Sequence, residues 1–152
     1  MIPWERATDF YSVCMDNTED GVCKGRLYHR YLSGPLMFQN LDDLIFQINE
    51  LCNQIGVPEA WERFRGKRVS ERVGNHLVEV PRNHEEIRTE QGKKETFWIV
   101  IVRRQFNTWQ GEVFWKEKQK DGRFNSITEL MVLLASAENW YTALHCERKL
   151  SI

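Results

Sequence analysis

The sequence predicts an α+β protein in which two pseudo-repeated β-β-β-α halves share an antiparallel sheet and two main helices. Two amphipathic helix patterns, at 41–55 and from Ile127, lie 86 residues apart. Strand-like segments precede both helices. In each half a glycine, Gly25 or Gly111, is followed thirteen residues later by a phenylalanine. This shared order indicates an internal duplication, with convergence on a common strand-helix pattern as the alternative.

The length and composition indicate one domain. The chain has 152 residues, of which 41% are hydrophobic and 28% charged, as is typical of a folded domain with a hydrophobic core. We expect a single domain over 1–152, with a first half at about 8–56, a connecting segment at 57–95 and a second half at about 96–140.

In the first half we expect three short strands, "DFYSVCM" (9–15), "GRLYHRYL" (25–32) and "LMF" (36–38). The helix 41–55 follows, because apolar residues recur in "LDDLIFQINELCNQI" at the i, i+3, i+4, i+7 spacing of one helix face. Asn40 is placed to cap its first turn.

The connecting segment is polar and rich in turn-forming residues. "PEAWERFRGKRV" (58–69) has the pattern of a short helix, and "HLVEV" (76–80) that of a short strand. For 81–95 we expect a mobile loop.

The second half begins with "TFWIVIVRRQF" (96–106), whose apolar run predicts a central strand covered on both faces. After a turn at Asn107-Thr108, "WQGEVFWKEK" (109–118) alternates apolar and polar residues. The period of two places three large side chains on the core face, namely Trp109, Val113 and Trp115.

A second hairpin and the second helix complete this half. Asp121-Gly122 is a strong hairpin-turn signal, and a short strand at 123–125 follows. Ser126 and Glu129 then form an S-x-x-E capping box in front of the apolar helix pattern. Each unit alone buries one face of a small sheet, so two units are needed to enclose a core.

Charge is unevenly distributed along the chain. The net charge is −1, which excludes a strong overall field toward nucleic acid or membrane. Residues 1–62 nevertheless carry four basic and ten acidic side chains, whereas residues 63–122 carry fourteen basic and nine acidic ones. We therefore expect a molecule with one acidic and one basic region.

The four cysteines include no CxxC pair and are best interpreted as small buried apolar residues. A zinc site made of Cys14, Cys23, His145 and Cys146 is the alternative, but its spacing fits no familiar ligand pattern. There is no Gly-rich phosphate loop, GxSxG or HExxH motif. We therefore expect no cofactor, no metal and no enzymatic activity, unless a catalytic site assembles from distant residues.

The start "MIPWERATDF" lacks the basic and apolar regions of a signal peptide. No apolar run approaches the roughly 20 residues that span a bilayer. We expect a cytoplasmic protein without a membrane partner.

Basic side chains in the middle of the chain, interleaved with aromatic ones, are the sharpest functional signal. Arginine and aromatic anchors favour protein partners, while cations beside flat rings also suit single-stranded nucleic acid. The candidate partner-binding residues are Arg63, Arg65, Lys67, Arg68, Arg103, Arg104, Trp109, Lys116 and Lys118.

The second half also resembles uncharacterised small proteins of anaerobic gut bacteria, through a "WQG...W...F.S..EL" pattern before a terminal helix. The matching residues are Trp109, Gln110, Gly111, Trp115, Phe124, Ser126, Glu129 and Leu130. The first half departs from the pattern, with Cys23 at the position that corresponds to Trp109. The resemblance brings no assigned activity and no catalytic residue. It implies a protein of the kind that travels on mobile elements, where small inhibitors of host nucleases recur.

Together these observations predict a non-enzymatic protein-binding module. It would be a small inhibitor or accessory factor that acts on a cytoplasmic, nucleic-acid-processing protein complex. The alternative is a nucleic-acid-binding protein that uses a basic and aromatic sheet face.

Overall fold

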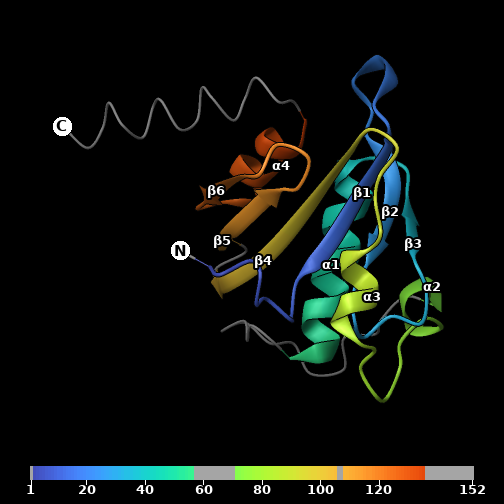
Figure 1. The fold of residues 1–152 in the computed structure, drawn as a ribbon. Helices are drawn as coiled ribbons and strands as arrows, with labels where there is room; N and C mark the ends of the chain where they lie inside the picture. Colours follow the sequence, from blue (N-terminus) through green and yellow to red (C-terminus); the bar gives the residue numbers. More distant parts are fainter. Residues whose placement is uncertain (1, 57–70, 106–107, 136–152) are drawn as a thin grey trace.

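The computed structural model describes residues 2–56, 71–105 and 108–135 (Figure 1). Within these ranges the chain forms a sheet of six strands and four α-helices. The elements are β1 (Tyr11–Asn17), β2 (Lys24–Tyr28), β3 (Leu36–Phe38), α1 (Leu41–Ile55), α2 (Glu71–Gly74), α3 (His84–Arg88), β4 (Glu95–Gln105), β5 (Thr108–Trp115), β6 (Lys120–Phe124) and α4 (Ile127–Ala135).

The strand order is β3-β2-β1-β4-β5-β6, and every neighbouring pair is antiparallel (Figure 1). The two first strands, β1 and β4, pair in the middle of the sheet and join the two halves of the chain. The α+β class, the antiparallel sheet and the two main helices, α1 and α4, are therefore confirmed.

Two glycines allow close packing at matching places in the sheet. Gly25 on β2 pairs with Phe38 on β3, and Gly111 on β5 pairs with Phe124 on β6. A methyl group at either glycine would overlap a backbone carbonyl oxygen of the neighbouring strand. It would also lie 3.1 Å from Cζ of Phe38 or 2.8 Å from Cζ of Phe124. Glycine is therefore required at both positions, where a phenylalanine ring of the next strand lies against the backbone of β2 or β5.

The register also shifts at matching places. Between β1 and β2 it shifts between Met15 and Asn17, and between β4 and β5 it shifts between Ile101 and Arg103. Such a β-bulge inserts one extra residue and redirects the side chains that follow it.

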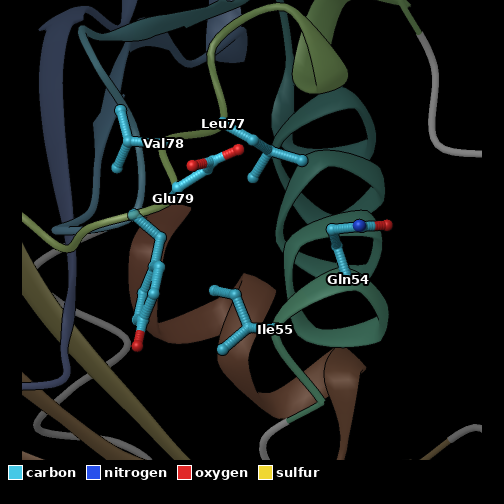
Figure 2. A pocket seen from close by; sticks show the side chains of 6 residues that line it. Gln54, Ile55, Leu77, Val78 and Glu79 are labelled. Atoms are coloured by element: carbon cyan, nitrogen blue, oxygen red, sulfur yellow. The ribbon is translucent and has the colours of Figure 1, made fainter.

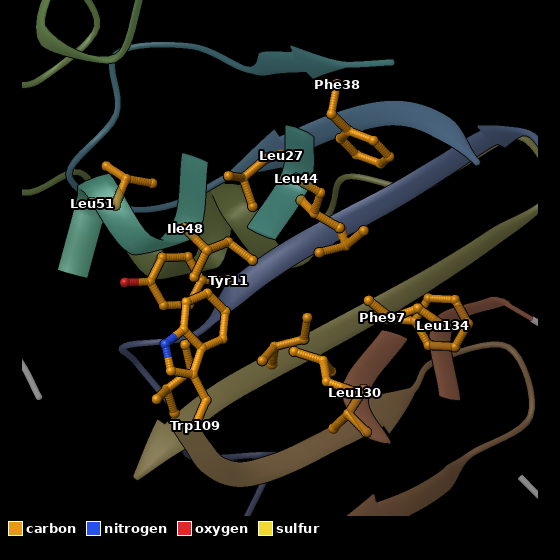
Figure 3. Close-up of a cluster of buried hydrophobic side chains, with 14 of the residues drawn as sticks. Tyr11, Leu27, Phe38, Leu44, Ile48, Leu51, Phe97, Trp109, Leu130 and Leu134 are labelled. Carbon is orange, nitrogen blue, oxygen red and sulfur yellow. The ribbon is translucent and has the colours of Figure 1, made fainter. Parts of the chain in front are cut away.

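Helices α1 and α4 cover one face of the sheet and enclose the main core. Figure 3 shows side chains from both helices meeting those of the strands. Those labelled there are Tyr11, Leu27, Phe38, Leu44, Ile48, Leu51, Phe97, Trp109, Leu130 and Leu134. Burial of this apolar surface is the main source of stability.

In the described part of the chain, the opposite face has a smaller and only partial cover. Residues from the N-terminal segment and from α3 pack there against β1, β2 and β4. Part of β4 is therefore covered on both faces, as predicted for the apolar run at 96–106. The buried members are Trp4, Phe10, Cys14, Tyr28, Ile87 and Trp98. Val100 and Phe114 lie at the margin of this cluster and are only half-buried.

The predicted limits of the first helix, the predicted start of the second and both caps are confirmed. Helix α1 spans Leu41–Ile55, and Asn40 Oδ1 accepts a 2.7 Å hydrogen bond from the Asp43 amide. Helix α4 begins at Ile127, and Ser126 Oγ accepts a 3.0 Å bond from the Glu129 amide.

The predicted hairpin turn at Asp121-Gly122 is wrong. Both residues lie inside β6, where Asp121 pairs with Phe114 and Gly122 pairs with Val113. The turn is made by residues 116–119, and Gln119 adopts a φ of 51°. Trp115 is the last core residue of β5, so the chain reverses directly after it rather than at the strongest turn dipeptide.

The connecting segment is more ordered than predicted. Residues 84–88 form α3, and Asn83 Oδ1 accepts a 3.0 Å bond from the Glu85 amide, so the prediction of a loop throughout 81–95 is wrong. Ile87, which is buried against the sheet, anchors the helix. The predicted strand 76–80 is reduced to a single bridge between Leu77 and Leu32. The predicted helix at 58–69 and Asn107 of the predicted turn lie outside the described residues.

Candidate functional site: the open sheet face over β4, β5 and β6

Among the residues that the structure describes, the sheet face opposite α1 and α4 has no complete cover over β4, β5 and β6. Val102 is 61% exposed there, and Val100 and Phe114 are half-buried. Elsewhere on the sheet, large apolar side chains are mostly buried. We call the exposed region, formed by Val100, Val102, Arg103, Glu112, Phe114 and Arg123, the open face.

The bulge in β4 is what exposes two neighbouring side chains on this face. Ile101 belongs to the helix-side core, and Arg104 contacts α1 on the same side. The two residues between them, Val102 and Arg103, are both exposed. Because the bulge interrupts the alternation of sides, both lie on the open face.

Charged side chains border the apolar centre of the open face. Across β5 and β6, Glu112 pairs in register with Arg123 and Phe114 with Asp121. Arg103 and Arg123 are exposed, while the two acidic residues are half-buried. An apolar centre with a charged rim is the usual composition of a protein-protein interface.

The predicted partner-binding residues separate into three groups. Arg103 lies on the open face, Lys116 lies at its border, and Lys118 is exposed in the β5–β6 turn. Four others are outside the described residues, namely Arg63, Arg65, Lys67 and Arg68.

The remaining two, Arg104 and Trp109, lie inside the protein. Trp109 is 3% exposed and belongs to the helix-side core, as its place on the predicted core face requires. Arg104 is 5% exposed, and its Nη1 donates 3.0 Å hydrogen bonds to Oδ1 of both Asn49 and Asn53 on α1. Both side chains are therefore away from any surface that a partner contacts.

A cavity of about 340 Å³ adjoins the open face, between the N-terminal segment and strands β4 and β5. Its walls include the rings of Trp4, Trp98 and Phe114 and the cationic side chains of Arg88 and Lys116. Sequence reasoning missed Trp4 and Arg88, because neither belongs to a periodic pattern and 84 positions separate them.

A second cavity, of about 330 Å³, lies at the C-terminal end of α1 (Figure 2). It is lined by Tyr31, Gln54, Ile55, Leu77, Val78 and Glu79. No buried polar side-chain atom of these six residues lacks a hydrogen-bond partner. This cavity therefore has no buried, unpartnered polar atom that would indicate a ligand.

The buried thiols and the buried imidazole are held in their neutral forms. Burial raises the pKa of Cys14 to about 11 and also raises the pKa of Cys52. Burial lowers the pKa of His29 to about 4. At neutral pH these groups do not form the thiolate-imidazolium pair of an activated cysteine.

No group of three or more His, Cys, Asp or Glu residues suited to a metal ion occurs in the part of the chain that the structure describes. Cys14 and Cys23, two members of the zinc alternative, lie in different core clusters on opposite sides of the sheet. His145 and Cys146 are outside the described residues. Among the described residues, none of the helices has the length and apolar character needed to cross a membrane.

This chain matches no protein-family model, no curated protein and no solved structure. Function is therefore inferred from the residues and contacts of the chain itself. The resemblance to small proteins of anaerobic gut bacteria stays a prediction.

Proposed function

We propose that the protein is a non-enzymatic protein-binding module whose partner binds the open face. The observation that carries this proposal is the unequal cover of the sheet. Two helices cover one face, whereas Val102 on the other is 61% exposed beside the half-buried Val100 and Phe114. An apolar patch rimmed by charges is typical of an interaction site.

The position of the aromatic rings favours a protein over a nucleic acid. Stacking of bases requires exposed rings beside cations. Trp109 and Trp115 are buried on the helix side, and Phe114 is half-buried. The open face carries acidic as well as basic groups, which suits a protein partner with charges of both signs. Binding to nucleic acid through Arg103 and Arg123 is the alternative.

We also propose that the two halves are a pseudo-repeat of one β-β-β-α unit. The order of elements, the Gly-Phe pairs and the bulges all recur at an offset of 86 residues. Convergence on a common pattern accounts for the order of the elements. It accounts less well for two bulges and two close-packed glycines at the same offset.

The pseudo-repeat explains why the binding surface belongs to the second half. The position equivalent to Val102 is Asp16, and Arg26 binds its carboxylate through Nε at 2.8 Å and Nη2 at 3.1 Å. Arg26 Nη2 also donates to the carbonyl oxygen of Gln91 at 2.8 Å, and the Lys93 amide donates to Asp16 at 3.0 Å. The segment before β4 thus closes this position in the first half, whereas Val102 is left open.

A module of this kind acts by occupying a partner's surface, which fits a small cytoplasmic inhibitor or accessory factor of a nucleic-acid-processing complex. The experiment that tests it is affinity purification of tagged protein from the organism that encodes it, with quantitative mass spectrometry. Wild type is compared with Val102→Glu. The matched control is Val80→Glu, because Val80 is 77% exposed outside the open face.

The proposal expects a partner in stoichiometric amount with wild type and with Val80→Glu, and its loss with Val102→Glu. Arg103→Glu should weaken the same complex, because the charge at the rim is reversed. If Val102→Glu and Val80→Glu retain the partner equally, the open face is not the binding surface. Recovery of nucleic acid in place of a protein would favour the alternative, with retention that weakens steeply as salt increases.

A further inference from the structure

We propose that the cavity beside the open face binds a small aromatic carboxylate. Its lining residues are Ile2, Pro3, Trp4, Glu5, Arg88, Trp98, Phe114, Lys116 and Gln119. Its volume of about 340 Å³ lies at the lower end of the range for small-molecule sites. The site adjoins the open face and shares Phe114 with it, but it lies under the N-terminal segment and does not involve Val102.

The walls of the cavity favour a flat, ring-bearing ligand. The rings of Trp4 and Phe114 are stacked, with centroids 5.5 Å apart and planes inclined by 24°. The ring of Trp98 is tilted against that of Phe114, with centroids 5.6 Å apart and planes inclined by 38°. Aromatic groups pack well against such surfaces in stacked or tilted arrangements.

The charge of the cavity favours an anion. The guanidinium carbon of Arg88 lies 4.9 Å from the ring centroid of Trp98, and Lys116 Nζ lies 5.5 Å from it. Within the described residues, Lys116 has no carboxylate within 4.0 Å, and Arg88 has only Glu85, at 3.9 Å from its Nε. Two cations thus border the cavity, and few nearby carboxylates neutralise their positive charge. The exposed Glu5 is the acidic residue among those that line the cavity.

Among the buried polar side-chain atoms of the cavity residues, those without a hydrogen-bond partner are all donors. Trp4 and Trp98 are 7% and 6% exposed, and their indole Nε1 atoms have no hydrogen-bond partner. Nε of Arg88 has none either. Buried N–H groups are paired in most native proteins, so these three donors favour a ligand that carries an acceptor.

A carboxylate meets these requirements because it accepts hydrogen bonds only, carries a negative charge and is readily attached to an aromatic ring. The fixed groups around the cavity support such a ligand. Arg88 Nη2 donates to the carbonyl oxygens of Trp4 at 2.7 Å and Ala7 at 2.5 Å, and Lys116 Nζ donates to the carbonyl oxygen of Arg88 at 2.7 Å. These bonds tie the N-terminal segment, α3 and the β5–β6 turn around one site.

The test is a calorimetric titration of the full chain with 2-naphthoate and two analogues. 2-Naphthamide keeps the ring and removes the charge, whereas cyclohexanecarboxylate keeps the charge and removes the ring. We expect saturable 1:1 binding of 2-naphthoate and binding about tenfold or more weaker for each analogue, as loss of a charge-assisted bond or of a stacking contact implies. The indole N–H resonances of Trp4 and Trp98 should shift on binding.

Lys116→Met is the variant that tests the site. Lys118→Met is its matched control, since Lys118 is exposed in the same turn and does not line the cavity. We expect 2-naphthoate binding to weaken about tenfold in the first and to stay unchanged in the second. Thermal unfolding checks that both variants fold.

Three results would each overturn the proposal. They are no saturable binding of 2-naphthoate to wild type, equal binding of 2-naphthoate and 2-naphthamide, or equal binding by the two lysine variants. The comparison of analogues uses wild type alone, so it decides the question even if Lys116→Met does not fold. A failure here leaves the protein-binding proposal intact, because that proposal is tested at Val102.

Discussion

Gly111→Ala should destabilise the protein much more than an ordinary surface substitution does. The added methyl group would overlap the carbonyl oxygen of Val100, and it would lie 2.8 Å from Cζ of Phe124 and 3.0 Å from Cα of Ile101. Two of these atoms belong to the backbone of β4 and cannot rotate away, so β4 and β5 must separate. Overpacking of this kind costs about 3 kcal/mol, which for a chain of this length lowers Tm by about 6–12 °C.

The assay is urea denaturation followed by tryptophan fluorescence, with Gly34→Ala as the matched control. A methyl group at Gly34 meets no atom within 4 Å, so its effect should stay within about 0.5 kcal/mol. Gly25→Ala should behave like Gly111→Ala, because its methyl group would overlap the carbonyl oxygen of Cys14. If Gly111→Ala is as stable as Gly34→Ala, the close approach of β4 and β5 and the register derived from it are incorrect.

Two further predictions concern stability: one compares the adjacent Arg103 and Arg104, and the other concerns the buried His29. Arg104→Ala should lower the free energy of unfolding by about 2 kcal/mol, since α1 loses a charged hydrogen-bond donor. Arg103→Ala should change the free energy of unfolding by less than about 0.5 kcal/mol. If urea denaturation shows the same loss of stability for both variants, the placement of Arg104 on the helix side and Arg103 on the open face is wrong. His29 has a pKa of about 4 in the folded protein because of burial, with a smaller contribution from the nearby charge of Arg30. Its unfolded value is near 6.5, so between these pH values the unfolded state binds the proton. The contribution of His29 to the free energy of unfolding should therefore be fully present above about pH 6.5. It should decrease as the pH falls toward 4, by on the order of 3 kcal/mol. His29→Phe should flatten this dependence while His84→Gln keeps it, and identical pH profiles for both variants would refute the role of His29.

Periodic elements could be predicted from the sequence because local patterns determine them. The apolar stripe of 41–55 and the cap at Asn40 specified α1 to the residue, and Ser126 with Glu129 specified the start of α4. The alternation in β5 correctly assigned Trp109 to the core face. The prediction of a turn at Asp121-Gly122 was wrong because the packing of core side chains overrides the local preference of a turn dipeptide.

The open face and its cavity could be predicted only in part. The exposure of Val102 depends on a bulge, and the register shift that creates it is a property of two strands together. The cavity combines Trp4 with Arg88, which are distant in sequence and meet through hydrogen bonds from a side chain to backbone carbonyls. No local pattern reports such contacts, whereas the exposed Arg103 was identified from the basic cluster alone.

The measurement that tests the central claim most directly is site-specific photo-crosslinking inside the cell. p-Benzoylphenylalanine is placed at Val102 or, as the control, at Val80, and both sites are exposed. The account predicts one dominant protein adduct from position 102 and none from position 80. Absence of an adduct at 102, or the same adducts from both positions, would contradict the assignment of the open face as the surface that binds a partner protein.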